Sequence, residues 1–380
     1  MENQKKQILK EIIKSLHNGA NFEQAKARFQ KEFANVSSSE IAQIEQELIS
    51  EGLPIEEVQR LCDVHSSLFK DSIQNDIEKP NIFIEQSIFN FNQENKEIEN
   101  LIKEVEGGQK DAVKKLLDAV DKHYQKKEIV LFPYLEKHGV TSPPKVMWGV
   151  DDEIRDALKD VLAKTENNAD SNVVKDLLND CIARIKDMIF KERNILLPML
   201  MDALDKNEWQ EILPQLINFN KPDDQKTDYN DTQRAQATGY SLDMSDYINL
   251  PSGKFKLNEL IACLNTLPFD ITFVDREDKV AYFTEGKERI FARERAVIGR
   301  SVYNCHPPKS QHIVREIMES FKQGKKDFED FWLKLGDKYV LIRYFAVRDQ
   351  DGTYLGTLEI TQDIAPIQKI TGEKRLLSQN

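Results

Sequence analysis

The C-terminal third of the chain alternates apolar and polar positions in short runs that end at charged or glycine-containing turns. The runs are Phe269–Asp275, Lys279–Phe283, Phe328–Leu335, Tyr339–Arg348 and Tyr354–Asp363, with a helical stretch between the second and the third. Strict alternation bounded by Gly and Asp turns is typical of an antiparallel sheet with one covered face. We therefore expect two strands, a run of short helices and then three long strands.

The earlier part of the chain repeats apolar residues every three or four positions, which indicates amphipathic helices. A first helical block spans residues 1–75, where Ser37 and Glu40 form a capping box. A second block spans residues 80–219, with helices expected at Ile84–Val105, Gln109–Glu136, Asp151–Lys164, Asn172–Asp205 and Trp209–Ile217. Long helices with short connections predict an antiparallel four-helix bundle.

A polar segment at residues 220–245 contains few apolar side chains and reads as a linker. The C-terminal module then occupies residues 246–368. The chain is therefore predicted to be an α+β multidomain protein with an all-α N-terminal module, a four-helix bundle and an antiparallel sheet with helices.

Composition and motif content argue against several classes of function. With 53 basic and 65 acidic residues the net charge is −12, which argues against nucleic acid or an anionic membrane as a partner. The cysteines, Cys62, Cys181, Cys263 and Cys305, form no CxxC pair, a pattern typical of a reduced cytoplasmic protein. No Gly-rich phosphate loop, GxSxG elbow or kinase signature is present, so we do not expect an enzyme.

The predicted four-helix bundle contains an internal sequence repeat and several longer sequence motifs. Lys127–Leu135 recurs in outline as Glu192–Leu200, with Pro133 aligned on Pro198, and the chain also contains the phrases His123-Tyr124-x-x-Lys127-Glu128 and Pro144–Val150. This block resembles the hemerythrin-like (HHE) cation-binding domain. The C-terminal order of elements resembles a PAS domain, a ligand-sensing module. The N-terminal block resembles the helical domain of unknown function that accompanies these two in bacterial proteins.

The hemerythrin resemblance implies two irons held by histidines and carboxylates on facing helices. Most positions expected to carry a ligand hold another residue: the first helix has Glu94 and Asn95, Asp151 begins the segment where a histidine is expected, and Arg193 replaces the second glutamate. His123 and Glu128 remain as the candidate metal residues of a degraded site, with Asp151, Asp152 and Glu192 as further oxygen donors. A di-iron centre is not expected, because Arg193 would repel a cation and Lys127 holds the better i+4 position from His123.

Cys305 and His306 are the candidate cofactor residues of the C-terminal module. Both are competent haem ligands, and Pro307 and Pro308 stiffen the loop that carries them. The sequence does not decide whether a cofactor binds here, because His306 can equally serve to close the loop. Apolar pocket walls are expected from Ile342, Tyr344, Phe345 and Leu358, which would suit a flat apolar ligand or a plain core.

The function predicted from these features is sensory. The PAS-type domain perceives a small ligand or cue, and the helical domains relay it to an unidentified protein partner. Two alternatives stay open: an iron-binding hemerythrin-like protein that responds to oxygen, nitric oxide or redox state, and a non-catalytic scaffold. A homodimer is also open, since the central strand Tyr339–Arg348 carries apolar groups on both faces.

Overall fold

The computed structural model describes residues 82–109, 111–167, 171–219, 221, 247–287 and 289–374, together with scattered positions between residues 7 and 52. These residues form two compact units, one helical and one α+β. The helices and the capping box expected within residues 1–75, and nearly all of the linker 220–245, lie outside the described residues.

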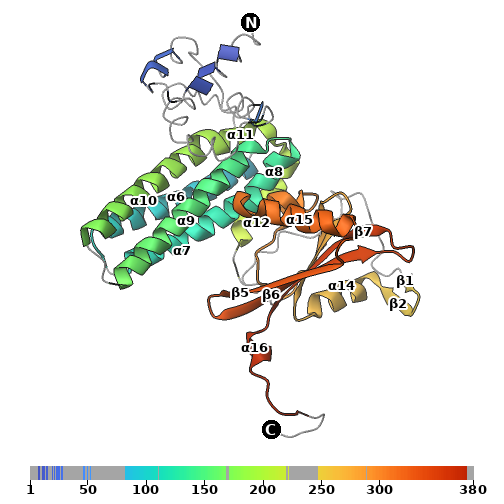
Figure 1. Cartoon of the computed structure of the whole chain (residues 1–380). Coiled ribbons are helices and arrows are strands. Elements are labelled where there is room, and N and C mark those ends of the chain that lie inside the picture. Colours follow the sequence, from blue (N-terminus) through green and yellow to red (C-terminus); the bar gives the residue numbers. More distant parts are fainter. Residues whose placement is uncertain are drawn as a thin grey trace. The chain divides into compact units, whose positions relative to one another are not determined.

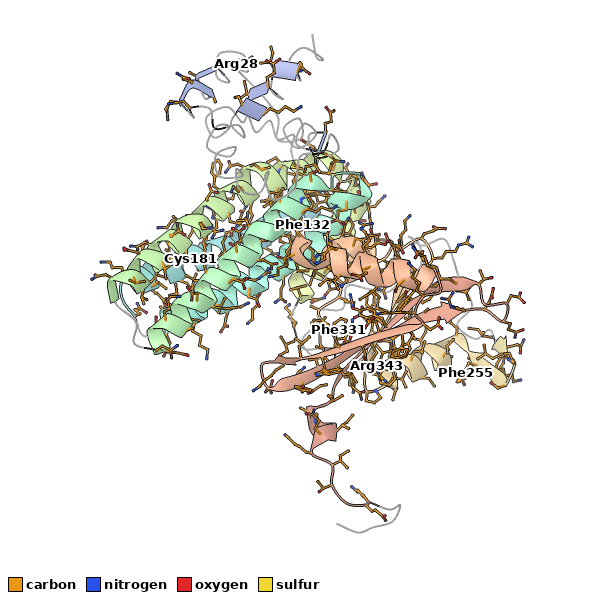
Figure 2. All side chains as sticks on the ribbon, viewed as in Figure 1. Arg28, Phe132, Cys181, Phe255, Phe331 and Arg343 are labelled. Atoms are coloured by element: carbon orange, nitrogen blue, oxygen red, sulfur yellow. The ribbon has the colours of Figure 1, made fainter. Side chains whose placement is uncertain are left out.

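The helical unit is built from four long antiparallel helices (Figure 1). They are α6 (Ile82–Glu106), α7 (Ala112–Lys126), α9 (Ser142–Glu166) and α10 (Ser171–Lys191). Each turns an apolar face inward, and Cys181 and Phe132, both labelled in Figure 2, are completely buried in this core. Helix α12 (Lys206–Asn218) packs against α6 and begins at a capping box formed by Asp205 and Glu208. The predicted bundle is confirmed.

The two halves of the sequence repeat share a π-helical turn. Helix α7 continues through η1 (Lys127–Leu131) into α8 (Phe132–Lys137), and α10 continues through η2 (Glu192–Leu196) into α11 (Leu197–Ala203). After each turn a backbone N–H bonds the carbonyl five residues back, from Phe132 to Lys127 and from Leu197 to Glu192. Pro133 and Pro198, the aligned prolines that follow these turns, have no backbone N–H. In each case one carbonyl of the preceding helical turn therefore lacks its usual intrahelical hydrogen-bond donor. The sequence repeat is thus a structural repeat.

Helix α9 begins at Ser142, nine residues before the predicted start at Asp151. The predicted bounds leave Pro143 and Pro144 in the connection between the helices Gln109–Glu136 and Asp151–Lys164, but both prolines lie in the first turn of α9. Proline is well tolerated there because the first N–H groups of a helix have no intrahelical partner. The earlier start makes α9 a full-length member of the bundle.

The α+β unit contains a five-stranded antiparallel sheet in the order β4-β3-β7-β6-β5 (Figure 1). Its strands are β3 (Asp270–Asp275), β4 (Val280–Phe283), β5 (Phe328–Leu335), β6 (Lys338–Arg348) and β7 (Tyr354–Asp363). The remaining elements are β1 (Tyr247–Leu250), β2 (Gly253–Lys256), α14 (Leu257–Thr266), η4 (Arg295–Val297), η5 (Val302–Cys305), η6 (Pro308–Ser310), α15 (Gln311–Lys322) and α16 (Ala365–Gln368). The predicted strand pattern is confirmed.

The face of this sheet that is covered by helices is polar near its centre. Val274 marks the covered face, because it packs against Val302 of η5 and Met318 of α15. Buried Thr272 and Asp270 lie on the same face of β3 and pair across to Glu359 and Thr361 of β7.

The apolar pocket walls were predicted only in part correctly. Ile342 and Tyr344 of β6 lie opposite Thr361 and Glu359 of β7, on the covered face. Phe345 and Leu358 form a cross-strand pair one position along, which places both on the other face of the sheet. Among the described residues no helix is both long enough and apolar enough to span a membrane.

Candidate functional site

Charged and polar side chains fill the centre of the helical bundle, where packing alone would favour apolar ones. They are Asn95 of α6, His123 of α7, Lys127 and Glu128 of η1, Asp151 and Arg155 of α9, and Glu192 of η2, and none is more than 7% exposed. The amphipathic faces of four separate segments bring these residues together. Because each is buried, its charge must be balanced inside the bundle.

His123 lies between two carboxylates from different helices. Its Nδ1 is 2.9 Å from Glu94 Oε2, and its Nε2 is 3.0 Å from Glu192 Oε2. Burial disfavours the imidazolium, but Glu192 and Glu94 outweigh it and raise the pKa of His123 above its ordinary value. In the charged form of the ring both nitrogens donate. Burial raises the pKa of Glu192, but Lys127 and then His123 outweigh it and lower that pKa to about 2.

Lys127 places its ammonium group between the carboxylates of Asp151 and Glu192. Its Nζ donates to Glu192 Oε1 at 2.6 Å and to Asp151 Oδ1 at 2.9 Å, and all three side chains are fully buried. The ring of Tyr124 adds a cation–π contact, 4.3 Å from Nζ to the ring centroid. Burial opposes the charge, yet Asp151 and Glu192 raise the pKa of Lys127.

Arg155 supplies a second buried cation. Its Nη1 donates to Glu128 Oε1 and its Nη2 to Glu128 Oε2, each at 2.9 Å, a bidentate ion pair. Nη1 also lies 3.1 Å from Asp152 Oδ1, and Nε lies 2.9 Å from Asp121 Oδ1. Burial raises the pKa of Glu128, and the guanidinium of Arg155 opposes that rise. Arg155 is therefore the buried ion-pair partner of Glu128, as Lys127 is the buried ion-pair partner of Asp151 and Glu192.

The two predicted metal residues both lie in this centre, but with different partners. His123 bonds Glu94 and Glu192, whereas Glu128 is engaged by Arg155. The positive charge expected from Arg193 is absent from the centre, because that side chain is about one-third exposed and pairs with Glu99 at 2.8 Å. The cations at the bundle centre are Lys127 and Arg155 instead, each paired with buried carboxylates.

Sequence reasoning noted Lys127 only as the residue four positions after His123, and it missed Arg155 and the ion pairs that both cations form. The signal was present in their spacing: Lys127 follows His123 by four residues, and Arg155 follows Asp151 by four. Residues four apart share one face of a helix, so each cation is on the same face as a residue already considered as a ligand.

The carboxylates of the centre are used by protein donors. Both oxygens of Glu128 accept from Arg155, and the two oxygens of Glu192 contact Lys127 Nζ, His123 Nε2 and Asn95 Nδ2. Within the described part of the chain no group of three or more His, Cys, Asp or Glu side chains is placed to hold a metal ion.

In the α+β unit, Cys305 ends η5 and His306 follows it. His306 Nδ1 donates to the carbonyl of Val302 at 2.8 Å, and Cys305 Sγ donates to the carbonyl of Ser301 at 3.6 Å. Burial lowers the pKa of His306. These contacts close the loop, which is the simpler of the two roles considered for these residues.

A haem would need two apolar faces beside His306. The covered face of the sheet instead presents Thr272, Glu359 and Thr361, and Arg293 donates to Glu359 at 3.0 Å. The charges around His306 do not fit a macrocycle.

Family comparisons assign the three parts of the chain. Profiles match for a family of unknown function (DUF438) at residues 9–75, for the hemerythrin HHE cation binding domain at residues 87–200, and for a PAS domain at residues 260–365. The order of domains predicted from the sequence is confirmed. A search of curated proteins finds no match to the chain.

Several solved structures are similar to a part of the chain. A C-terminal domain from Streptococcus mutans is 32% identical, with a TM-score of 0.32, and the match covers 33% of this chain and 98% of that one. A sensory box sensor histidine kinase from Vibrio cholerae is 16% identical, with a TM-score of 0.22 and coverage of 27% and 87%. A PAS domain from Colwellia psychrerythraea is 17% identical, with a TM-score of 0.23 and coverage of 29% and 98%.

Proposed function

Because the chain carries a DUF438 domain, a hemerythrin HHE domain and a PAS domain in that order, we propose that it is a sensory protein and not an enzyme. The PAS domain perceives a small ligand or cue, and the helical domains relay the change to a protein partner. We place the protein in the cytoplasm, on the evidence of cysteines that are scattered along the sequence.

The relay domain works without a metal in this proposal. The observation that carries it is the position of Lys127 Nζ, 2.6 Å from Glu192 and 2.9 Å from Asp151, with no exposed surface on any of the three side chains. A metal ion at this place would have to displace the buried ammonium group of Lys127, and it would also be close to the guanidinium of Arg155. Two positive charges close together in a medium of low dielectric repel each other strongly.

The buried cations explain why the bundle keeps its carboxylates. An unpaired buried carboxylate is costly, and one buried cation per carboxylate cluster removes that cost. Lys127 and Arg155 serve Glu192, Asp151 and Glu128 in this way. We therefore interpret the hemerythrin-like centre as degraded for metal and retained as a set of ion pairs that fixes the register of the helices.

Two other functions make different predictions. An iron-binding hemerythrin-like protein would need His123 and Glu128 to leave their present partners, and a scaffold would bind no small molecule. The geometry favours neither. His123 and Glu128 are both engaged by other side chains of the bundle, and the covered face of the sheet carries charged groups that a plain core does not require.

The experiment combines ligand recovery with hydrogen exchange on the full chain. Small molecules released by denaturing the purified protein are identified by mass spectrometry and added back to protein stripped of them. We expect binding to slow exchange in the α+β unit and also to change it in α6 or α9. Failure to bind any recovered molecule, or an effect confined to the α+β unit, would contradict the proposal.

A further inference from the structure

The segment after β4 carries a half-buried arginine, Arg289, whose two terminal nitrogens are buried without hydrogen-bond partners among the described residues. Its guanidinium carbon lies 5.1 Å from the centre of the Phe283 ring, a cation–π contact that leaves the N–H groups themselves unsatisfied. Two such unpaired donors on a cation are costly to bury, so their retention calls for a functional reason.

An unpaired acceptor lies beside these donors. Asp270 begins β3 on the covered face of the sheet and is 6% exposed. Its Oδ2 accepts from the backbone N–H of Ile290, the residue after Arg289, at 2.8 Å, but its Oδ1 is buried with no partner in the described structure. The same hydrogen bond holds the Arg289 segment against Asp270, so the two charged groups are neighbours without forming an ion pair.

No carboxylate of the described residues hydrogen-bonds the terminal nitrogens of Arg289. The nearby carboxylate Glu359 is already used by Arg293 at 3.0 Å and by the hydroxyl of Thr361 at 3.1 Å. Burial and the like charge of Arg293 lower the pKa of Arg289, and the carboxylates of Asp270, Glu285 and Glu294 oppose that shift without bonding its terminal nitrogens. A guanidinium in this position gains more from an anion than one that is exposed to water.

We propose that Arg289 and Asp270 bind a small carboxylic acid that carries an amino or hydroxyl group next to its carboxylate. The carboxylate accepts from the two terminal nitrogens of Arg289, in the bidentate geometry that a guanidinium favours. The neighbouring amino or hydroxyl group donates to Oδ1 of Asp270. One small molecule then satisfies both donors and the acceptor that the protein leaves unpaired.

This inference rests on the proposed sensory role of the PAS domain and names the class of its ligand. An α-amino acid carries one positive and one negative charge, which complements the pair of Asp270 and Arg289. An α-hydroxy acid offers the same hydrogen bonds with one charge fewer. The two sources share the recognised chemistry, and the test separates them.

The test is isothermal titration calorimetry of the full chain with four probes of similar size. Alanine and lactate carry both groups, propionate lacks the donor, and lactamide lacks the carboxylate. We expect saturable binding of alanine, lactate or both, and binding at least about tenfold weaker for propionate and lactamide, the loss expected for a charge-assisted hydrogen bond. Equal affinity for all four, or no saturable binding of alanine and lactate, overturns the proposal.

Variants assign the binding to the site. Arg289→Gln should weaken binding of the preferred acid at least about tenfold, and it should raise the thermal midpoint of the ligand-free protein because it removes a buried unpaired charge. Arg295→Gln is the matched control, since Arg295 lies on the same connection but its side chain is 56% exposed. Unchanged binding in Arg289→Gln, or a lowered midpoint without ligand, assigns Arg289 a structural role and overturns the proposal.

The outcomes also separate this inference from the sensory role. Binding of a different recovered molecule, unaffected by Arg289→Gln, would overturn the ligand class and leave the sensory role standing. Binding of the acid at Arg289 without any change of hydrogen exchange in the helical unit would support the ligand class and contradict the proposal that the helical domains relay the signal.

Discussion

Lys127 and Glu192 occupy equivalent positions of the internal repeat, six residues before Pro133 and Pro198, and their side chains meet at 2.6 Å in the middle of the bundle. Each opens a π-helical turn. One repeat thus contributes a cation where the other contributes a carboxylate. A symmetric pair of positions that could face a shared ion from two sides instead forms a direct ion pair.

Replacing Lys127 with methionine removes the ammonium group and keeps much of the side-chain volume. Asp151 and Glu192 are then left as buried carboxylates without that partner, so we expect the free energy of unfolding to fall by about 3–5 kcal/mol. Denaturant unfolding followed by the helical circular dichroism signal measures this. Lys122→Met on the exposed side of α7 is the control and should change stability by no more than about 0.5 kcal/mol. A similar small effect for both variants would contradict the account.

The pair of Glu128 and Arg155 should show strong coupling in a double-mutant cycle. Glu128→Gln alone leaves the buried guanidinium without its bidentate partner, and Arg155→Met alone leaves the carboxylate. We expect the double variant to be less destabilised than the sum of the two, by about 1–3 kcal/mol. The same unfolding experiment measures the cycle, and purely additive effects would show that the pair does not act as a unit.

His123 should titrate above the ordinary histidine pKa of 6.5, because Glu192 and Glu94 stabilise its charged form more than burial disfavours it. Its contribution to stability is complete below pH 6.5 and is lost as the pH rises through the pKa of the folded state. Nuclear magnetic resonance of the ring follows the titration directly. Glu192→Gln should lower the pKa of His123, whereas Glu208→Gln, which removes the carboxylate beside His138, should leave it unchanged. A pKa at or below 6.5 in the unmodified protein sinks this prediction.

Haem should not bind at His306. The ring already donates from Nδ1 to Val302, and the nearby covered face carries Glu359 and Arg293 where a macrocycle needs apolar contacts. Titration of the full chain with haemin should therefore give no saturable Soret band. A saturable band that His306→Ala abolishes would restore the haem assignment.

The fold followed from the sequence closely where alternation alone determines it. The predicted bounds of β5 and β7 match the structure to the residue, because β5 ends and β7 begins beside a turn that contains Gly and Asp. Helix α9 was predicted nine residues short, because a proline pair can either break a helix or begin one. Only the tertiary packing decides between those two roles.

The candidate site was harder to predict for a physical reason. The two π turns shift the helical phase, so that consecutive Lys127 and Glu128 are both buried, which a uniform period of 3.6 residues does not anticipate. The pairing of each cation with its carboxylates depends on contacts between helices far apart in sequence. Spacing places Lys127 and Arg155 on the helix faces of His123 and Asp151, but it could not show which carboxylates each cation pairs with.

Iron content tests the central claim most directly. Elemental analysis and an absorption spectrum of the full chain, purified from iron-replete cells without added metal, measure it. The account predicts well under one tightly bound iron per chain, because Lys127 and Arg155 already pair with Asp151, Glu192 and Glu128. Two irons per chain with the absorption band of an oxo-bridged pair would contradict it.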